Sequence, residues 1–318
     1  MTACALNYKD FTMPKKPIES QELTKKEFAI LAFLGTYKFL STKHIVKLSN
    51  LKDISQSKST QNYYSSIRKL ENGGLIKRIT HAEKGWSNGG RLPDISYLTE
   101  AGKNALLEMP DCPILPQEIR CVPRFTAPAA KLFANHKMAV ADFLISFLHH
   151  TEQSELDFVR YEADFDFVGG GRTDEGLRPK TRMYFEKDPK IALEKSNYTP
   201  DVVLLYNQKN DDGTSEKKAL IVEICMGELK DVLRIETQIR EHKIGLYQKL
   251  PQKKYDLAKY PDVLFVFSEA KTMQKVMKNC EEHGTIAGFE HFFSFVLLEA
   301  IERGFDKKDF LQVKPLET

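Results

Sequence analysis

Two apolar segments near the middle of the chain constrain its fold more than any other feature. They read YTPDVVLLY (198–206) and ALIVEICMG (219–227), and the polar segment NQKNDDGTSEKK joins them. Short apolar runs on either side of a polar turn are typical of two paired strands. Pairing would bring Asp201 and Glu223 to the same edge of a sheet, where two carboxylates suit Mg²⁺. The alternative is ordinary turn chemistry, because Asp is common in solvated loops.

The Pro-Asp pair and Glu223 resemble the PD-(D/E)xK nuclease motif, with one departure. Cys225 stands where that motif has lysine. The resemblance implies that Asp201 and Glu223 bind Mg²⁺ or Mn²⁺, which polarises a phosphoryl oxygen. We interpret Cys225 as a small buried residue, because a reactive thiol needs exposure and a lowered pKa.

Composition narrows the class of protein. The chain has 318 residues and five cysteines without a CxxC pair, so neither zinc nor a disulfide framework is expected, and a reducing cytoplasm fits best. No run of about 20 apolar residues predicts a membrane segment, and the N-terminus lacks the pattern of a signal peptide. Residues 1–130 hold 19 Lys and Arg against 12 Asp and Glu. A basic N-terminal half favours a polyanionic partner, although uneven surface charge alone is the alternative.

The N-terminal segment is expected to form a small helical domain with a hairpin. The pattern predicts helices from residue 24, over 43–48 and over 60–72, then strands over 75–80 and 95–98 and a closing helix after Thr99. The residues RKLENGGLIKRI and YLTEAG resemble the winged helix-turn-helix family. That resemblance implies that the third helix enters the DNA major groove and that the wing contacts the backbone. The DNA-binding residues expected on this basis are Gln61, Asn62, Tyr63, Ser66, Arg68, Lys69, Lys77, Arg78 and Arg91. Tyr63 has the alternative of a core residue, and a winged helix can also dock proteins.

A connector rich in proline separates this region from a second domain. The boundaries expected are a tail over 1–22, the winged helix over 23–110, a linker over 111–129, a nuclease-like domain over 130–306 and a tail over 307–318. The second domain alternates helices and strands, so the fold class expected is α/β, or α+β overall. A restriction-endonuclease-like mixed sheet flanked by helices should follow the winged helix.

Several segments together resemble the replication-relaxation family of plasmid proteins, which includes MobC-type conjugative relaxases. They are NHKMAVADFLISF, VRYEADF, TPDVVLLY, LIVEICMG and HKIGLYQKL. The resemblance implies metal-dependent nicking of DNA at a plasmid transfer origin. It assigns Glu162, Asp201 and Glu223 to the metal and Lys243 to catalysis in place of the missing lysine. His136 and His242 are expected to be structural.

Two classes of function stay open. The first is a nickase for plasmid mobilisation, whose partners are double-stranded DNA, mobilisation or coupling proteins and a second copy of the chain in a homodimer. The second is a non-catalytic DNA-binding protein for replication or transcription, with a degenerate nuclease domain that serves for dimerisation. Cys225 favours the second class, and the retained acids favour the first. A restriction endonuclease is a more distant third.

Overall fold

The computed structural model describes residues 23–52, 54, 60–79, 94–109, 112–122, 134–152, 156–168, 178–187, 195–210, 212–227, 229–304 and 311. Within them the chain divides into two compact units. The described residues up to Ile145 form the N-terminal unit, and those from Ser146 onward form the C-terminal unit. None of the helices in the described ranges is long and apolar enough to span a bilayer.

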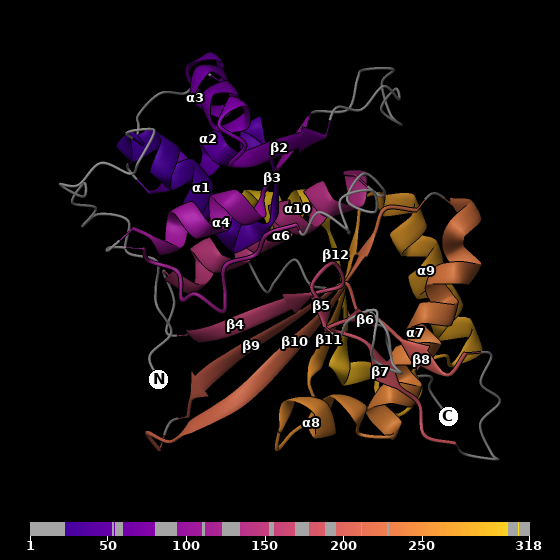
Figure 1. The fold of residues 1–318 in the computed structure, drawn as a ribbon. Helices are drawn as coiled ribbons and strands as arrows, with labels where there is room; N and C mark the ends of the chain where they lie inside the picture. The colour runs from indigo at the N-terminus through magenta and orange to yellow at the C-terminus, as the bar shows by residue number, and fades with distance from the viewer. Residues whose placement is uncertain are drawn as a thin grey trace. The chain divides into compact units, whose positions relative to one another are not determined.

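The N-terminal unit combines four helices with a small antiparallel sheet in its described part up to residue 107 (Figure 1). Its elements are α1 (Lys25–Tyr37), β1 (Phe39–Ser41), α2 (Thr42–Leu51), α3 (Gln61–Asn72), β2 (Ile76–Ile79), β3 (Ile95–Leu98) and α4 (Glu100–Leu107). The strands lie in the order β1-β3-β2. The predicted helices and both hairpin strands are confirmed, whereas β1 was not expected.

Local capping explains where these helices begin. Thr24 Oγ1 accepts a hydrogen bond from the Glu27 N–H at 3.2 Å, and Glu27 Oε2 accepts one from the Thr24 N–H at 2.8 Å. This is the predicted capping box. Ser41 caps α2 and Thr99 caps α4 in the same way, through their side-chain oxygens. Each cap satisfies backbone donors that the first helical turn leaves unpaired.

The proline-rich segment packs onto the N-terminal unit over its described part, residues 112–122. Ile114, Ile119 and Val122 are buried. The Arg120 N–H donates to Gly35 O at 2.7 Å, and the Val122 N–H donates to Leu98 O at 3.0 Å. This part therefore belongs to the core of the N-terminal unit rather than to an open linker. The division between the units falls inside the next helix, α6 (Ala134–Glu152).

The C-terminal unit is built on one mixed sheet of five strands, in the order β12-β11-β10-β9-β4 (Figure 1). The strands are β4 (Asp157–Ala163), β9 (Val202–Lys209), β10 (Ser215–Cys225), β11 (Asp262–Phe267) and β12 (Phe293–Leu297). β9 pairs antiparallel with both β4 and β10, and β11 pairs parallel with both β10 and β12. This confirms the predicted mixed sheet with flanking helices.

Helices and short strands complete this unit. They are η3 (Leu229–Asp231), α7 (Val232–Tyr247), α8 (Leu250–Tyr255), α9 (Ala270–His283), η4 (Glu290–Phe292) and α10 (Leu298–Arg303), with the short strands β5 (Phe167–Val168), β6 (Arg178–Pro179), β7 (Met183–Tyr184) and β8 (Asn197–Tyr198). One face of the sheet packs on α7, α8 and α9 through a shared core that contains Ile221, Phe265, Ile239 and Val276.

A glycine lets α7 approach the sheet closely. A Cβ atom on Gly245 would lie 2.3 Å from Tyr198 Oη and 2.6 Å from Tyr198 Cζ. Tyr198 is buried, and its hydroxyl donates to Met183 Sδ at 3.4 Å. The Tyr198 side chain therefore has little room to move away from a larger residue at position 245.

Gly245→Ala should therefore destabilise the C-terminal unit by about 1–3 kcal/mol, the usual cost of overpacking a filled core. Urea unfolding followed by circular dichroism measures this change. Adding Tyr198→Phe removes the nearest atom, so the double variant should recover part of the loss. An unchanged midpoint in Gly245→Ala alone would contradict this account of the contact.

Candidate metal centre

Three carboxyl groups lie in one row across neighbouring strands of the C-terminal sheet. The register pairs Val203 with Ile221 and Val202 with Val222, so one further step sets Asp201 opposite Glu223. On the other side Ala163 pairs with Val202, and one further step sets Asp164 opposite Asp201. The Asp164 N–H donates to Asp201 O at 2.8 Å, which closes this end of the strand pair.

Distances and hydrogen bonds confirm that the row is close-packed. A carboxylate oxygen of Asp164 and one of Asp201 lie within 4.8 Å of each other. Asp201 Oδ2 accepts a hydrogen bond from the Ile224 N–H at 2.7 Å. Glu223 is 2% exposed and lies on the face of β10 that packs under α7, between Ile221 and Cys225. The sheet therefore concentrates negative charge at the edge of a dry core.

This concentration changes the acidity of Glu223. Burial is the largest cause, followed by the negative charge of Asp201 and the hydrogen bond that the two carboxyl groups share, and together they raise the pKa of Glu223 well above its usual value. Asp164 and Glu241 raise the pKa further. Like charges close together disfavour ionisation of all of them. A bound cation would offset the repulsion that raises this pKa.

His242, from α7, reaches the row from the helix side. Its Nε2 lies 2.6 Å from Glu223 Oε1, and both side chains are almost fully buried. Burial lowers the pKa of His242 to about 3, so the imidazole is neutral at physiological pH. The expectation that His242 is a structural residue overlooked this contact. His242 directly precedes Lys243, the helix residue that the family resemblance assigns to catalysis. That position is the sequence signal that could have indicated the contact between His242 and Glu223.

Lys243 occupies a different place from the one expected. It is half-buried on α7, and within the described ranges no hydrogen bond or ion pair joins it to the three carboxyl groups. A helix turns by about 100° per residue, so adjacent positions point in different directions. The residue that contacts Glu223 is therefore His242. A catalytic role for Lys243 has no contact to support it.

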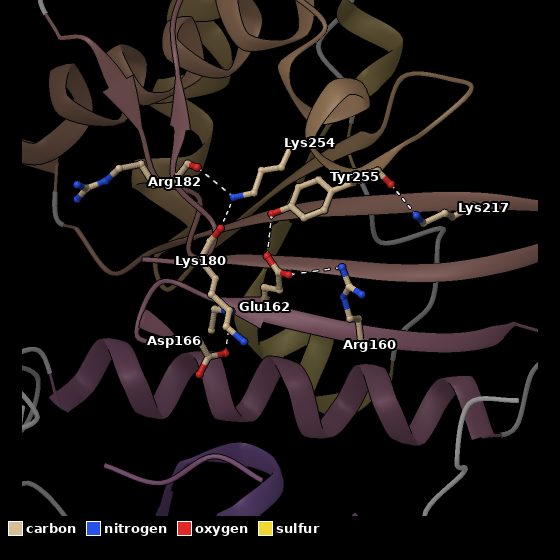
Figure 2. A network of polar contacts seen from close by, with 9 residues as sticks. Arg160, Glu162, Asp166, Lys180, Arg182, Lys217, Lys254 and Tyr255 are labelled. Atoms are coloured by element: carbon tan, nitrogen blue, oxygen red, sulfur yellow. Dashed lines mark hydrogen bonds and ion pairs between the residues drawn. The ribbon is translucent and has the colours of Figure 1, made fainter. Parts of the chain in front are cut away.

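Glu162 lies in the neighbouring row on the same face, opposite Val203. Figure 2 shows its carboxylate between two partners. Tyr255 Oη donates to Glu162 Oε2 at 3.2 Å, and Arg160 Nη2 lies 3.6 Å from Glu162 Oε1. Glu162 therefore stands apart from the row, and the acid that joins it is Asp164, the residue directly after β4. Asp164 follows Glu162 by two residues, and strand register alone decides between them.

Helix α8 connects Glu162 to a basic turn between β6 and β7 (Figure 2). Lys254 Nζ donates to Arg182 O at 3.0 Å and also to Lys180 O. Burial lowers the pKa of Lys254 to about 8. Arg182 Nε donates to Thr199 Oγ1 at 3.3 Å, two residues before Asp201. The guanidinium of Arg182 points away from the network in Figure 2, and in the described residues no carboxylate pairs with it.

Cys225 is buried, as expected. It is 3% exposed on the same face as Glu223, and burial is the first of the causes that raise its pKa well above the usual value. The neighbouring Glu223 and Asp201 raise it further. A thiol held protonated in a dry core is neither a nucleophile nor a replacement for lysine.

The DNA-binding residues predicted in the N-terminal unit differ in their exposure and in their partners. Gln61, Asn62, Arg68, Lys69 and Lys77 are exposed, and Ser66 is partly exposed. Arg78 and Lys69 are engaged in ion pairs, since Arg78 Nη2 lies 2.6 Å from Glu71 Oε2 and Lys69 Nζ lies 3.0 Å from Glu27 Oε2. Arg91 lies outside the described residues. Among the described residues of this set, Arg68 and Lys77 are the exposed cations that have no carboxylate partner.

The expectation that Tyr63 contacts DNA is wrong. Its side chain is fully buried in the helical core, together with Ile67 and Leu70. The three residues are spaced three and four apart, so they share one face of α3. The exposed tyrosine of this helix is the next residue, Tyr64.

Comparisons with protein-family models, with curated proteins and with solved structures find no match to this chain. The arrangement of the carboxyl row and of α3 therefore carries the functional argument.

The carboxyl row has a stability consequence that can be measured. The raised pKa of Glu223 means that the folded protein holds this proton more tightly than the unfolded chain does. The stabilisation is therefore complete below the unfolded pKa of about 4.5 and is lost as the pH rises through the higher folded pKa. Glu223→Gln removes the charge, so in EDTA it should raise Tm more at pH 8 than at pH 5.

The control for this measurement is Glu282→Gln, on α9. Glu282 is exposed and pairs with Lys278 at 3.5 Å, a kind of contact that contributes little. Its effect on Tm should be small at both pH values. Equal Tm changes for Glu223→Gln at pH 5 and pH 8 would contradict the charge repulsion described above.

Proposed function

We propose that Asp164, Asp201 and Glu223 bind a divalent cation, Mg²⁺ or Mn²⁺, in a DNA-nicking enzyme. The observation that carries the proposal is the buried Glu223 Oε2. Apart from the hydrogen bond that the Glu223 and Asp201 carboxyl groups share when one is protonated, no donor in the described residues reaches this oxygen, and Glu223 lies beside a second and a third carboxyl group. A buried acceptor without a partner is costly, and a cation would remove that cost. The oxygen-only donor set suits Mg²⁺ or Mn²⁺.

Each residue has a role in this reading. Asp164, Asp201 and Glu223 hold the cation, which when bound polarises a phosphoryl oxygen and favours an attacking water. Arg182 donates a hydrogen bond to Thr199, which lies two residues before Asp201 in the sequence. Its guanidinium is offered to a phosphate, a group that arginine binds in a bidentate way. Glu162 is not a ligand of the cation in this proposal, because its carboxylate is engaged by Tyr255 and Arg160.

The proposal that the substrate is DNA is based on the N-terminal unit. The element order α1-β1-α2-α3-β2-β3 and the sheet order β1-β3-β2 favour a winged helix-turn-helix. α3 exposes Gln61, Asn62 and Arg68, which suits a helix in the major groove. In the C-terminal unit, the order α6-β4-β9-β10-α7-β11 agrees with a restriction-endonuclease-like core. With the family resemblance, these features favour a relaxase acting at a plasmid transfer origin.

A second candidate is the non-catalytic DNA-binding protein. Two observations favour it: Cys225 is buried where the motif has lysine, and in the described residues no lysine contacts Glu223. In that case the C-terminal unit would serve for dimerisation, and DNA binding alone would be the activity.

Asp201→Ala should abolish relaxation of supercoiled plasmid DNA that carries the cognate origin and leave DNA affinity nearly intact. The loss should be at least about a thousandfold in rate, because a metal ion contributes several kcal/mol to the transition state. The measurement is a relaxation assay with Mg²⁺ or Mn²⁺, beside a DNA-binding titration. Asp262→Ala is the control, since Asp262 begins β11 away from the row.

Two outcomes of that assay would change the conclusion. Full activity in Asp201→Ala would remove the carboxyl row from the mechanism. A wild-type protein that binds origin DNA tightly but never nicks it with any divalent metal would establish the second candidate.

DNA affinity should fall steeply with salt, because phosphate contacts release counterions. The double variant Arg68→Ala, Lys77→Ala removes two exposed cations from α3 and β2. It should reduce the slope of log K against log salt by about two. Fluorescence anisotropy between 50 and 200 mM salt, roughly the range over which such contacts are lost, measures the slope.

Lys271→Ala, Lys275→Ala is the matched control for this experiment. Both lysines are exposed on α9 in the C-terminal unit, so their removal should leave the slope nearly unchanged. An equal slope in the wild type and in the Arg68, Lys77 variant would refute the docking of α3 and β2 on DNA.

A further inference from the structure

The imidazole of His242 is held in one orientation by aromatic rings on two sides. The Tyr198 ring lies 5.0 Å from it at 79°, and the Phe265 ring lies 5.6 Å from it at 86°. Both are edge-to-face contacts, which aromatic pairs favour. Gly245, one turn further along α7, allows the close approach to Tyr198. The ring therefore has a defined place under the sheet, with Nε2 directed at Glu223.

The two oxygens of Glu223 differ in what surrounds them. Oε1 lies 2.6 Å from His242 Nε2. Oε2 is buried, and the described residues give it no hydrogen-bond donor. The contact with His242 thus occupies one oxygen and leaves the second oxygen for the row in which Asp201 stands opposite Glu223. A carboxylate without that contact could rotate about its last side-chain bond.

We propose that His242 is a positioning residue, which orients Glu223 so that its second oxygen can ligate a divalent cation together with Asp201 and Asp164. This inference rests on the proposed function. With a cation bound, a neutral imidazole that carries its proton on Nε2 would donate to the Glu223 carboxylate and would itself contact neither cation nor substrate. Hydrogen bonds of this kind set the geometry of metal-binding side chains, and their loss typically weakens metal binding 10- to 100-fold, roughly.

A purely structural role for the pair accounts for the geometry less well. A buried polar pair loses its hydration on both sides, and well-packed apolar residues of similar size are often as stable or more stable. Besides Glu223, the side chains in contact with the imidazole of His242 include the aromatic rings of Tyr198 and Phe265. A leucine at position 242 would fit such surroundings. The presence of histidine next to Glu223 is therefore better explained by the proposed role of Glu223 as a ligand of the cation.

The test measures Mn²⁺ affinity of the full-length protein by calorimetry at one fixed pH, with electron paramagnetic resonance of free Mn²⁺ as a second readout. His242→Leu should weaken Mn²⁺ binding by about 10- to 100-fold. His242→Gln carries an amide nitrogen at a position comparable to Nε2, so it should recover most of the affinity. His242→Asn, one carbon shorter, should not.

Asn279→Ala is the matched control. Asn279 is buried on α9 and donates to Glu236 Oε1 of α7, so its loss also removes a buried hydrogen bond from α7. It should lower Tm but leave Mn²⁺ affinity unchanged. Circular dichroism and Tm of each metal-free variant separate a loss of fold from a loss of binding.

The outcomes are distinct. A wild-type protein that binds no Mn²⁺ would overturn the proposed function. A wild-type protein that binds Mn²⁺ no more tightly than His242→Leu would overturn the positioning role alone. The same holds if folded His242→Gln binds as weakly as His242→Asn, because the hydrogen bond would then not be the cause. If His242→Leu fails to fold, the comparison of His242→Gln with His242→Asn decides.

Discussion

Repulsion among carboxyl groups is the physical constraint on which the rest of the C-terminal unit depends. Asp164 directly follows β4, Asp201 directly precedes β9 and Glu223 lies within β10, and strand pairing brings the three acids to the same row. Glu223 is buried there, and burial together with Asp201 raises its pKa. A fold selected for stability alone would place an apolar residue at position 223. The surrounding core, with Ile221, Phe265 and Ile239, supplies the stability that this row reduces.

The helix that covers the row has two tasks. It buries apolar residues against β10 and β11, and it carries His242 to Glu223. The glycine at 245 serves the second task, because it brings α7 close enough to Tyr198 for the imidazole to be held between aromatic rings. The neighbouring α8 links Glu162, through Tyr255, to the turn that holds Arg182 (Figure 2). Proposed cation and phosphate contacts are thus organised by the same helical layer.

In the N-terminal unit, helix α3 has one face in the core and another exposed to solvent. Tyr63, Ile67 and Leu70 of α3 are core residues, whereas Gln61, Asn62 and Arg68 face solvent. Several of its basic side chains are already paired, as Arg78 is with Glu71. The charge available to a polyanion is therefore smaller than the composition of residues 1–130 suggests. Within the described ranges, Arg68 and Lys77 are exposed and have no carboxylate partner, which is why these two carry the salt-dependence experiment.

Periodicity, capping residues and apolar runs determined most elements of this protein from the sequence alone. The start of α1 directly after Thr24 and the hairpin strand Ile95–Leu98 follow directly from local patterns. The approach of Asp201 to Glu223 also follows, because two strands joined by one turn meet at a common edge. Only the tertiary structure decided which acid of β4 joins them, Asp164 rather than Glu162, and which residue of α7 reaches Glu223, His242 rather than Lys243. Strand register and helix rotation make those choices, and both depend on packing between segments distant in the sequence.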